Sequence, residues 1–318
     1  MSIAMFPTIA CEIAPEGTDC LRLTLVAPDG KPLPAFSPGA HIDVLTPAGL
    51  TRQYSLCGSP HDTAWYEICV KRESTSRGGS RSLHEGVKPG AVLMISAPRN
   101  AFPLPEASRH ILIAGGIGIT PLIPMVRDLS ARGRSFAFHY YASRPAEAPF
   151  LTEFRAGAFG PGASLRASFA DHPPAGLESA DPADAIMLCG PTGFMAAVRT
   201  RALFHGWRAE QIHCEHFQPP VDLPAHQGGD EAFAVRLARS GRVLEVGADE
   251  SIAEALLAQG VSVDLSCEQG MCGACLMPLL DGEADHRDSV QGDGEKARNV
   301  QIALCCSRAK SACLVLDL

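Results

Sequence analysis

The chain contains no long apolar run and no excess of basic residues. Its apolar stretches are short, such as residues 111–114, which Gly115 interrupts, and none approaches the ~20 residues that cross a bilayer. Lys and Arg number 27 against 35 Asp and Glu, a net charge of −8, so we expect no nucleic-acid partner. The first seven residues lack the basic segment of a secretory signal, so we expect a cytoplasmic protein that does not associate with membranes.

The composition is that of a globular protein. Apolar residues make up 46% and charged residues 19% of the 318 residues, which is too apolar a balance for intrinsic disorder. At roughly 150 residues per domain, a chain of this length holds two domains, or three if one is small.

The twelve cysteines are unevenly distributed. Six of them follow residue 266, in the last sixth of the chain. A chain of this length has a core large enough to need no disulfides, and such clustering is typical of a metal site in a reducing compartment. We therefore expect a cysteine-ligated metal centre near the end of the sequence.

The first hundred residues alternate polar and apolar side chains in short runs separated by turn sequences. Asp29-Gly30, Pro38-Gly39 and Pro89-Gly90 are typical turn pairs. Short strands at close spacing predict a small antiparallel β-barrel. The expected strands are residues 21–26, 41–44, 65–70 and 92–95.

From residue 110 onward, fully apolar strands alternate with helical patterns. This alternation predicts a parallel sheet covered by helices. The expected strands are residues 110–114, 136–140 and 185–190, and the expected helices are residues 122–132 and 193–204.

A Pro- and Gly-rich stretch at residues 218–230 predicts a linker to a last, smaller domain. That domain opens with expected strands at residues 232–238 and 243–246. An amphipathic helix at residues 251–258 follows, and Ser251 with Glu254 three positions later predicts a capping box at its start.

The strongest motif lies in this last segment, where three cysteines follow the spacing C-x4-C-x2-C and a fourth follows after 29 intervening residues. This is the spacing of plant-type [2Fe–2S] proteins. Gly270 and Gly273 allow the positive φ that a tightly wrapped loop needs, and they let backbone N–H groups approach the sulfurs. A structural zinc site would usually add a second C-x2-C or a His pair, which the sequence lacks. The predicted cluster ligands are Cys267, Cys272, Cys275 and Cys305.

The fourth ligand requires a choice, because Cys305 and Cys306 are adjacent. Successive residues of a strand point to opposite faces, so only one of the two can reach the cluster. Plant-type ferredoxins place this ligand directly after an apolar residue, as Leu304 precedes Cys305. We predict Cys305, with Cys306 as the alternative.

Three segments of the expected barrel resemble the flavin-binding segments of the ferredoxin–NADP reductase superfamily. They are the R-x-Y-S motif at residues 52–55, the Val-Lys-Arg run at residues 70–72, and the Gly-Gly-Ser turn at residues 78–80. A flavin needs a flat wall for its ring and a cationic or N–H-rich place for its phosphate. The alternative is a basic surface loop on an ordinary barrel. The resemblance implies that the flavin contacts are Arg52, Tyr54, Ser55, Leu56, Val70, Lys71, Gly78, Gly79, Ser80, Thr120 and Phe217.

Two further turns resemble the nicotinamide-binding turns of the same superfamily. Residues 115–121 read G-G-I-G-I-T-P, and residues 189–191 read C-G-P. A Gly-rich turn lets a pyrophosphate approach backbone N–H groups at a helix N-terminus, with Pro121 near the first helical position. The resemblance implies that the nucleotide contacts are Gly115, Gly116, Gly118, Arg144, Cys189, Gly190 and Pro191. Arg144 would also suit a 2′-phosphate, so NADPH stays open, although the related proteins favour NADH.

The order of these motifs covers nearly the whole chain and resembles the phthalate dioxygenase reductase family. The resemblance implies a multidomain protein with an antiparallel β-barrel flavin domain (residues 1–104) and an α/β NAD domain with a parallel sheet (105–220). A linker (221–231) and a C-terminal α+β plant-type ferredoxin domain of the β-grasp fold (232–318) follow. Residues 291–294 depart from the family pattern, in which an apolar residue is common there, and this puts the loop above the cluster in doubt.

The resemblance further implies an NADH-dependent oxidoreductase that needs no catalytic acid or base. NADH delivers two electrons as hydride and a [2Fe–2S] cluster takes one, so a flavin must connect them. Relatives with a C-terminal ferredoxin use FMN. The expected acceptor is a Rieske-type oxygenase that hydroxylates or O-demethylates an aromatic compound, and we expect a monomer. The alternatives are a stand-alone NAD(P)H reductase of a ferric chelate or cytochrome, and a scaffold that keeps the ferredoxin module for docking.

Overall fold

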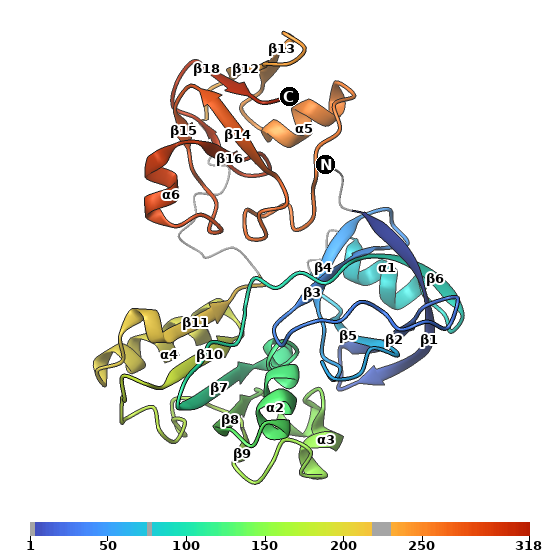
Figure 1. The fold of residues 1–318 in the computed structure, drawn as a ribbon, viewed down its shortest axis with the longest axis vertical. Helices are drawn as coiled ribbons and strands as arrows, with labels where there is room; N and C mark the ends of the chain where they lie inside the picture. Colours follow the sequence, from blue (N-terminus) through green and yellow to red (C-terminus); the bar gives the residue numbers. More distant parts are fainter. Residues whose placement is uncertain (1–3, 75–77, 218–229) are drawn as a thin grey trace. The chain divides into compact units, whose positions relative to one another are not determined.

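The chain forms two compact units in a computed structural model that describes residues 4–74, 78–217 and 230–318. Of these residues, 4–217 belong to the first unit and 230–318 to the second (Figure 1). The predicted linker (221–231) lies outside the described residues except for Asp230 and Glu231.

The first part of the larger unit is an antiparallel barrel. Its six strands pair in the order β4-β3-β6-β1-β2-β5, and a bridge between Leu56 and Ile68 joins the two edges. Apolar side chains from alternate positions, such as Leu23, Ile42 and Ile95, fill its interior and are fully buried. The elements are β1 (Met5–Glu16), β2 (Cys20–Val26), β3 (His41–Leu45), β4 (Thr51–Ser55), β5 (Tyr66–Lys71), α1 (Gly79–Gly86) and β6 (Ala91–Ser96).

The second part of the larger unit is a parallel sheet of five strands in the order β11-β10-β7-β8-β9. Leu112 and Phe138 face a cluster with α2, whereas Ile113 and Leu188 face a cluster with α4, so helices cover both faces. The elements are β7 (Arg109–Gly115), α2 (Leu122–Ala131), β8 (Ser135–Tyr141), α3 (Leu151–Arg155), β9 (Ala163–Arg166), β10 (Ala185–Cys189), α4 (Thr192–Phe204) and β11 (Ile212–Glu215).

The smaller unit is an α+β fold around a five-stranded mixed sheet in the order β13-β12-β18-β14-β16. Helix α5 (Ile252–Ala258) packs Ile252 and Leu256 into its core. Ser251 and Glu254 form the predicted capping box, with 3.1 Å from the Glu254 N–H to the Ser251 hydroxyl. The remaining elements are β12 (Phe233–Leu237), β13 (Val243–Val246), β14 (Leu276–Asp281), β15 (Ala284–Asp285), α6 (Asp293–Arg298), β16 (Gln301–Ala303), β17 (Arg308–Ala309) and β18 (Cys313–Leu316).

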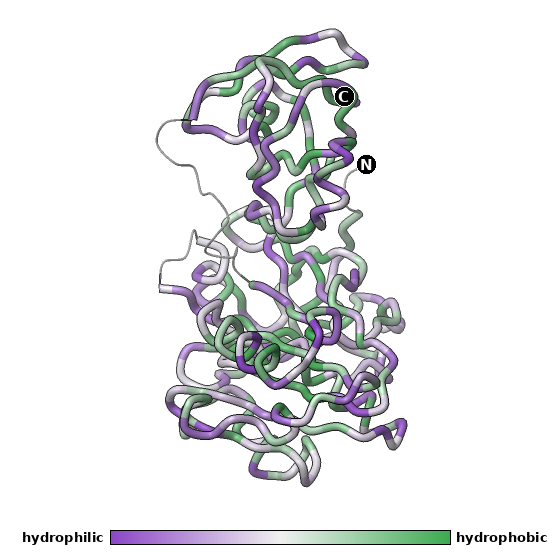
Figure 2. The backbone as a smooth tube through the Cα atoms, turned by 90° about the vertical axis from the view of Figure 1, so that its left-hand side faces the viewer, coloured by the Kyte–Doolittle hydropathy of each residue, from purple (hydrophilic) through white to green (hydrophobic). Residues whose placement is uncertain are grey.

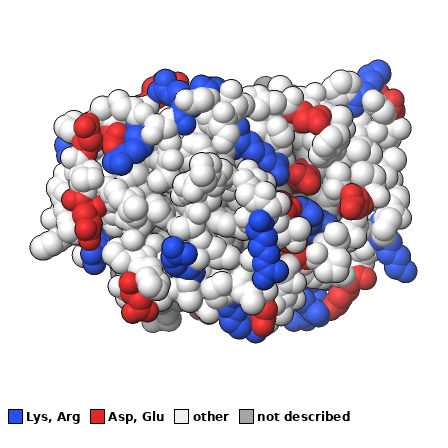
Figure 3. All heavy atoms as spheres, turned by 90° about the horizontal axis from the view of Figure 1, so that it is seen from below, with Lys and Arg blue, Asp and Glu red and all other residues white. Residues whose placement is uncertain are grey.

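The hydropathy of the chain follows this layering. In Figure 2 hydrophobic stretches run through the inside of each unit, and hydrophilic stretches lie mainly in peripheral turns. On the face in Figure 3, Lys and Arg side chains are intermixed with Asp and Glu, so that face offers no extended surface of one sign. Among the described residues, none of the helices combines the length and the apolar character needed to span a bilayer.

Candidate functional site

The four predicted cluster cysteines come together in the smaller unit as two pairs. Cys275 Sγ lies 3.2 Å from Cys305 Sγ, and the Cys267 and Cys272 thiols are hydrogen-bonded to each other. A two-iron cluster needs two thiolates at each iron, and this pairing supplies them. Within the described ranges, no three His, Cys, Asp or Glu side chains are arranged to hold a single metal ion. The two thiol pairs are a donor set that fits a [2Fe–2S] cluster.

Backbone N–H groups of the loop point at these sulfurs. Gln269 N–H donates to Cys267 Sγ at 3.4 Å, Ala274 N–H donates to Cys272 Sγ at 3.4 Å, and Gly270 N–H donates to Cys305 Sγ at 3.3 Å. The Cys272 thiol and nearby backbone N–H groups lower the pKa of Cys267 to about 6. Cys267 is thus the ligand that favours the thiolate, the form that binds iron, whereas hydrogen bonds between thiols and burial raise the pKa of Cys272, Cys275 and Cys305.

The two loop glycines have the predicted left-handed backbone, with φ of +71° at Gly270 and +74° at Gly273. At Gly270 there is also no space for a side chain. A Cβ there would lie 2.5 Å from Cys306 Sγ and 3.0 Å from the Cα of Asp288. The loop can therefore close around the sulfurs only with glycine at this position.

Cys305 and Cys306 do not lie on a strand, so the alternation argument for choosing between them was wrong. Strand β16 ends at Ala303, and the two cysteines occupy the turn that follows, held by the Ser307 N–H bond to Ala303 O at 3.0 Å. The two thiols differ in their neighbours. Cys305 Sγ reaches Cys275, whereas Cys306 Sγ packs against the Cα of Gly270 and lies 3.9 Å from the Ser307 hydroxyl.

The two predicted nucleotide turns pack against each other at the carboxyl end of the parallel sheet. A Cβ at Gly118 would lie 2.5 Å from the carbonyl carbon of Cys189, and one at Gly190 would lie 2.9 Å from the Cα of Gly115. Ligands of open α/β sheets bind at this end of the strands. The glycines thus permit a backbone-to-backbone contact that leaves N–H groups close to the strand ends.

The helix after the Gly-rich turn starts at the predicted residue, Leu122, and a tighter turn precedes it. Residues Gly116–Ile119 form a 3₁₀ turn, and α2 begins at Leu122, so Pro121 occupies the N-cap and not the first helical position. Thr120 is buried, and its hydroxyl donates to Ile117 O at 3.0 Å. The small residues of the turn allow this tighter winding before the α-helix starts.

Cys189 and Arg144 are the other nucleotide candidates, and Phe217 is a predicted flavin contact. Cys189 is fully buried, and burial raises its pKa well above the ordinary value, so its thiol is not a nucleophile. Arg144 is exposed and forms an ion pair with Glu147 at 2.7 Å. Phe217 is 38% exposed and follows β11.

The predicted flavin segments meet at one end of the barrel. Arg52, Tyr54 and Ser55 lie on β4, and Val70 and Lys71 lie on the other edge strand, β5. His84 of α1 contacts Val70 O at 2.8 Å, and a Cβ at Gly79 would lie 2.8 Å from the Arg52 side chain. The start of α1, with Gly78 at φ +106° and no side-chain cap, is therefore held next to a guanidinium. A helix start beside an arginine suits a phosphate group.

The sequence motifs missed one residue of this region, Glu215 at the end of β11. It is buried with Oε2 unpartnered, it receives a hydrogen bond from Ser55, and burial raises its pKa to about 8. Its strand neighbour in register is Cys189. Glu215 therefore connects the flavin motif of the barrel with the nucleotide turn of the parallel sheet. Its position at the carboxyl end of a strand was the signal that could have identified it.

Comparisons with known proteins show the family of the chain. Residues 235–310 match the family model described as "2Fe-2S iron-sulfur cluster binding domain". The chain is 42% identical to vanillate O-demethylase oxidoreductase of Pseudomonas sp. (strain HR199 / DSM 7063), over 94% of this chain and 96% of that protein. It is 40% identical to phthalate dioxygenase reductase of Burkholderia cepacia, over 94% and 93% of the two chains.

A solved structure shows the same architecture. The structure described as phthalate dioxygenase reductase, "a modular structure for electron transfer from pyridine nucleotides to [2Fe-2S]", superposes with a TM-score of 0.76 at 38% identity, over 99% of this chain and 98% of that one. The predicted fold class and the predicted oxidoreductase activity are confirmed. The chain belongs to the phthalate dioxygenase reductase family of oxygenase reductases, and its C-terminal unit is a 2Fe-2S cluster-binding domain.

Proposed function

We propose that this chain is the NADH-dependent reductase component of a Rieske-type oxygenase that hydroxylates or O-demethylates an aromatic compound, with FMN as its flavin. The observation that carries the proposal is the pairing of the four cysteines in one unit, together with the Ser55–Glu215 contact between the flavin and nucleotide segments in the other. We assign residues 1–104 to flavin binding, 105–220 to NADH binding, 221–231 to the linker and 232–318 to the cluster.

The division of chemistry follows from electron counting. When bound, the flavin supplies the conversion of a two-electron hydride donor into single electrons, and the [2Fe–2S] cluster supplies one-electron transfer to the oxygenase. The protein's residues bind and orient these groups. Cys267 and Cys272 would hold one iron, and Cys275 and Cys305 would hold the other.

In the larger unit, the side chains of β4 and the start of α1 would hold FMN. Arg52 and the backbone of Gly78, Gly79 and Ser80 suit a terminal phosphate, which favours a mononucleotide. Tyr54 and Ser55, on the same strand, would contact the ring. The Gly-rich turn and the turn at residues 189–191 would hold NADH so that its nicotinamide lies near Ser55 and Glu215.

Replacing Arg52 by Ala is expected to weaken FMN binding by roughly 10- to 100-fold, because a charge-assisted hydrogen bond contributes ~1.5–3 kcal/mol. The measurement is the Kd of FMN for the flavin-free protein, from the quenching of flavin fluorescence. Arg239→Ala is the matched control, since Arg239 belongs to the other unit, its side chain is 71% exposed, and it is paired with Asp317 at 2.9 Å. Equal Kd values in the two variants would contradict the assignment, and release of FAD from the wild type would contradict FMN.

The raised pKa of Glu215 predicts that the free energy of unfolding of the larger unit depends on pH. Its pKa is about 8 in the folded chain against an ordinary 4.5, so its contribution to folding is complete below pH 4.5 and is lost as the pH rises through 8. We expect the free energy of unfolding of the larger unit to fall more steeply between about pH 5 and 9 in wild type than in Glu215→Gln, which cannot ionise. Urea unfolding at several pH values measures this.

The control for that prediction is Glu106→Gln, since the Glu106 side chain is 86% exposed. This variant should follow the wild-type pH profile. Parallel profiles for wild type and Glu215→Gln would show that Glu215 is not held as the neutral acid.

The function is tested by a visible spectrum before and after anaerobic NADH, followed by coupling to an oxygenase. We expect flavin and cluster absorption that NADH bleaches, and FMN on release. Addition of a purified Rieske oxygenase and its aromatic substrate should then couple NADH oxidation to product. A chain that NADH reduces but that turns over only ferric chelates or cytochrome c would support the stand-alone reductase instead.

A further inference from the structure

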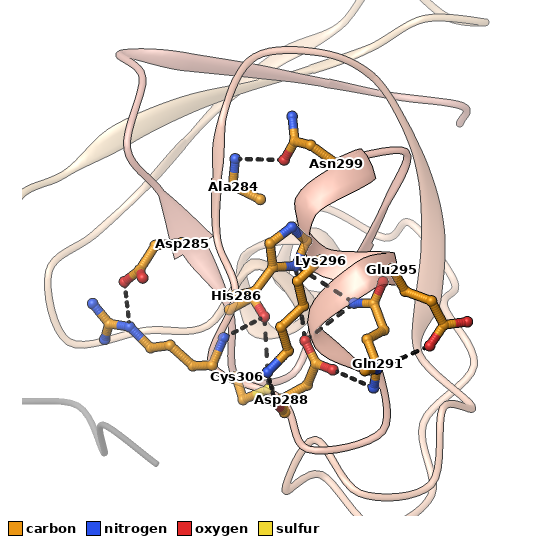
Figure 4. Close-up of polar contacts among 12 residues, drawn as sticks. Ala284, Asp285, His286, Asp288, Gln291, Glu295, Lys296, Asn299 and Cys306 are labelled. Atoms are coloured by element: carbon orange, nitrogen blue, oxygen red, sulfur yellow. Dashed lines mark hydrogen bonds and ion pairs between the residues drawn. The ribbon is translucent and has the colours of Figure 1, made fainter. Parts of the chain in front are cut away.

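A buried polar turn packs against the cluster loop from outside. It comprises residues 286–291, between β15 and α6. Asp288 is fully buried, Gln291 is 4% exposed, and the His286 side chain is 9% exposed. Figure 4 shows these side chains directed toward one another beside Cys306. A buried carboxylate is costly unless it is held by hydrogen bonds, so its partners indicate what it does.

The Asp288 carboxylate fixes the shape of the turn. Its Oδ2 accepts the Gln291 backbone N–H at 2.8 Å, and its Oδ1 accepts the Gln291 side-chain amide at 3.1 Å. His286 Nδ1 lies 3.8 Å from the same Oδ1. Lys296 of α6 donates from Nζ to the backbone oxygen of Asp288. These bonds hold both ends of the turn, and the Gln291 side chain, which departs from the apolar family pattern, takes part in them.

The turn at residues 286–291 is hydrogen-bonded to the cluster loop at one residue, Gly270. The backbone N–H groups of Ser289 and Val290 both donate to Gly270 O, at 2.9 and 3.2 Å. The Cα of Asp288 also packs against the Cα of Gly270, where a Cβ would lie only 3.0 Å away. Gly270 has no side chain to restrict its backbone, so these contacts determine its orientation.

Gly270, the residue that the turn holds, is also the residue whose N–H group donates to a predicted cluster ligand. Gly270 N–H donates to Cys305 Sγ at 3.3 Å. Hydrogen bonds to ligand sulfurs stabilise the more negative, reduced cluster and help to retain the metal. The turn holds both the Cα and the carbonyl of Gly270, and the Cα is bonded to the nitrogen that donates to the sulfur, so a displacement of the turn displaces the donor.

We propose that the Asp288 turn, residues 286–291, acts as a clasp that holds the cluster loop in place. Asp288 is then a positioning residue that sets the Gly270 N–H donation to Cys305. Through this hydrogen bond it sets the retention and the reduction potential of the cluster. The inference rests on the proposed cluster-binding function. In this role Asp288 acts through Gly270.

The test compares Asp288→Ala and Asp288→Asn with a matched control, Asp293→Asn, in the full-length chain. Asp293 is an exposed acid at the start of α6, five residues away. We measure iron per chain, the rate of cluster loss to an iron chelator, and the midpoint potential of the cluster. Reduction of ferricyanide by NADH reports the larger unit separately.

We expect Asp288→Ala to lose its cluster about 10–100-fold faster than wild type, the usual effect of removing an outer partner of a metal site. Its cluster potential should be lower, because an N–H donor to sulfur is weakened. Asp288→Asn keeps an acceptor for the Gln291 N–H, so it should lie between Asp288→Ala and wild type. The control should match wild type, and ferricyanide reduction should be unchanged in all variants.

The experiment distinguishes failure of the proposed function from failure of the clasp. A wild-type chain that binds no iron would overturn the proposed function and the clasp with it. A wild-type chain with its cluster, and Asp288 variants with unchanged potential and loss rate, would overturn the clasp alone. If Asp288→Ala does not fold, Asp288→Asn decides: a lowered potential at an unchanged melting temperature supports the clasp, and an unchanged potential overturns it.

Discussion

Replacing Cys305 by Ala is expected to abolish cluster binding and to leave NADH-dependent reduction of ferricyanide intact. Cys305 Sγ is paired with Cys275 Sγ at 3.2 Å and receives the Gly270 N–H, so its loss leaves one iron with a single protein thiolate. Iron per chain should fall at least about tenfold, the scale on which metal sites respond to a lost partner. The flavin and nucleotide segments lie in the other unit, so hydride transfer from NADH should continue.

The adjacent cysteine provides the matched control. Cys306→Ala removes the same number of atoms from the same turn, but its sulfur packs against Gly270 and is not the partner of Cys275. This variant should keep its visible spectrum and its iron. Retention of iron in Cys305→Ala together with its loss in Cys306→Ala would reverse the assignment of the fourth ligand.

Segments with a regular local pattern could be predicted from the sequence. The apolar strand before Gly115 and the one before Gly190 were expected because a strand buried on both faces needs continuous apolar residues. The capping box of Ser251 and Glu254 was expected because both of its hydrogen bonds are local.

Segments whose shape depends on distant contacts could not be predicted in this way. Strand β1 was missed, since Pro7 and Pro15 and a shift of register between Ala10 and Glu12 break its alternation. Helix α1 begins at Gly79, directly after Gly78, and its position is set by packing on Arg52 and Val70. In both cases tertiary contacts override weak local preference.

The site residues also divide into those that a local sequence pattern predicts and those that depend on distant contacts. The cysteine spacing and the glycine turns are local, and they identified where the chemistry belongs. Glu215 and Asp288 are single acids that become distinctive only through burial and through partners in other segments, Ser55 in one case and Gly270 in the other. A buried acid has no local signature, because its partners come from far along the chain.

Replacing Gly118 by Ala is expected to lower kcat/KM for NADH by roughly 10- to 100-fold, corresponding to the ~1–3 kcal/mol cost of overpacking. A Cβ at this position would lie 2.5 Å from the carbonyl carbon of Cys189 and 2.7 Å from the Gly190 nitrogen. Both atoms belong to backbone, so no side chain can rotate away. The two nucleotide turns must therefore separate, and this displaces the N–H groups proposed to hold the dinucleotide.

Stopped-flow reduction of the flavin at several NADH concentrations measures this loss, and Gly193→Ala is the control. Gly193 lies in α4 with no atom within 4 Å of an added Cβ, and alanine is the better helix former. The control should reduce its flavin as fast as wild type and unfold at the same or a higher temperature. Equal rates in the two variants would show that the contact between the turns does not hold the nucleotide. An effect confined to Gly118→Ala, with unchanged cluster absorption, would locate NADH binding at these turns, because the cluster cysteines belong to the other unit.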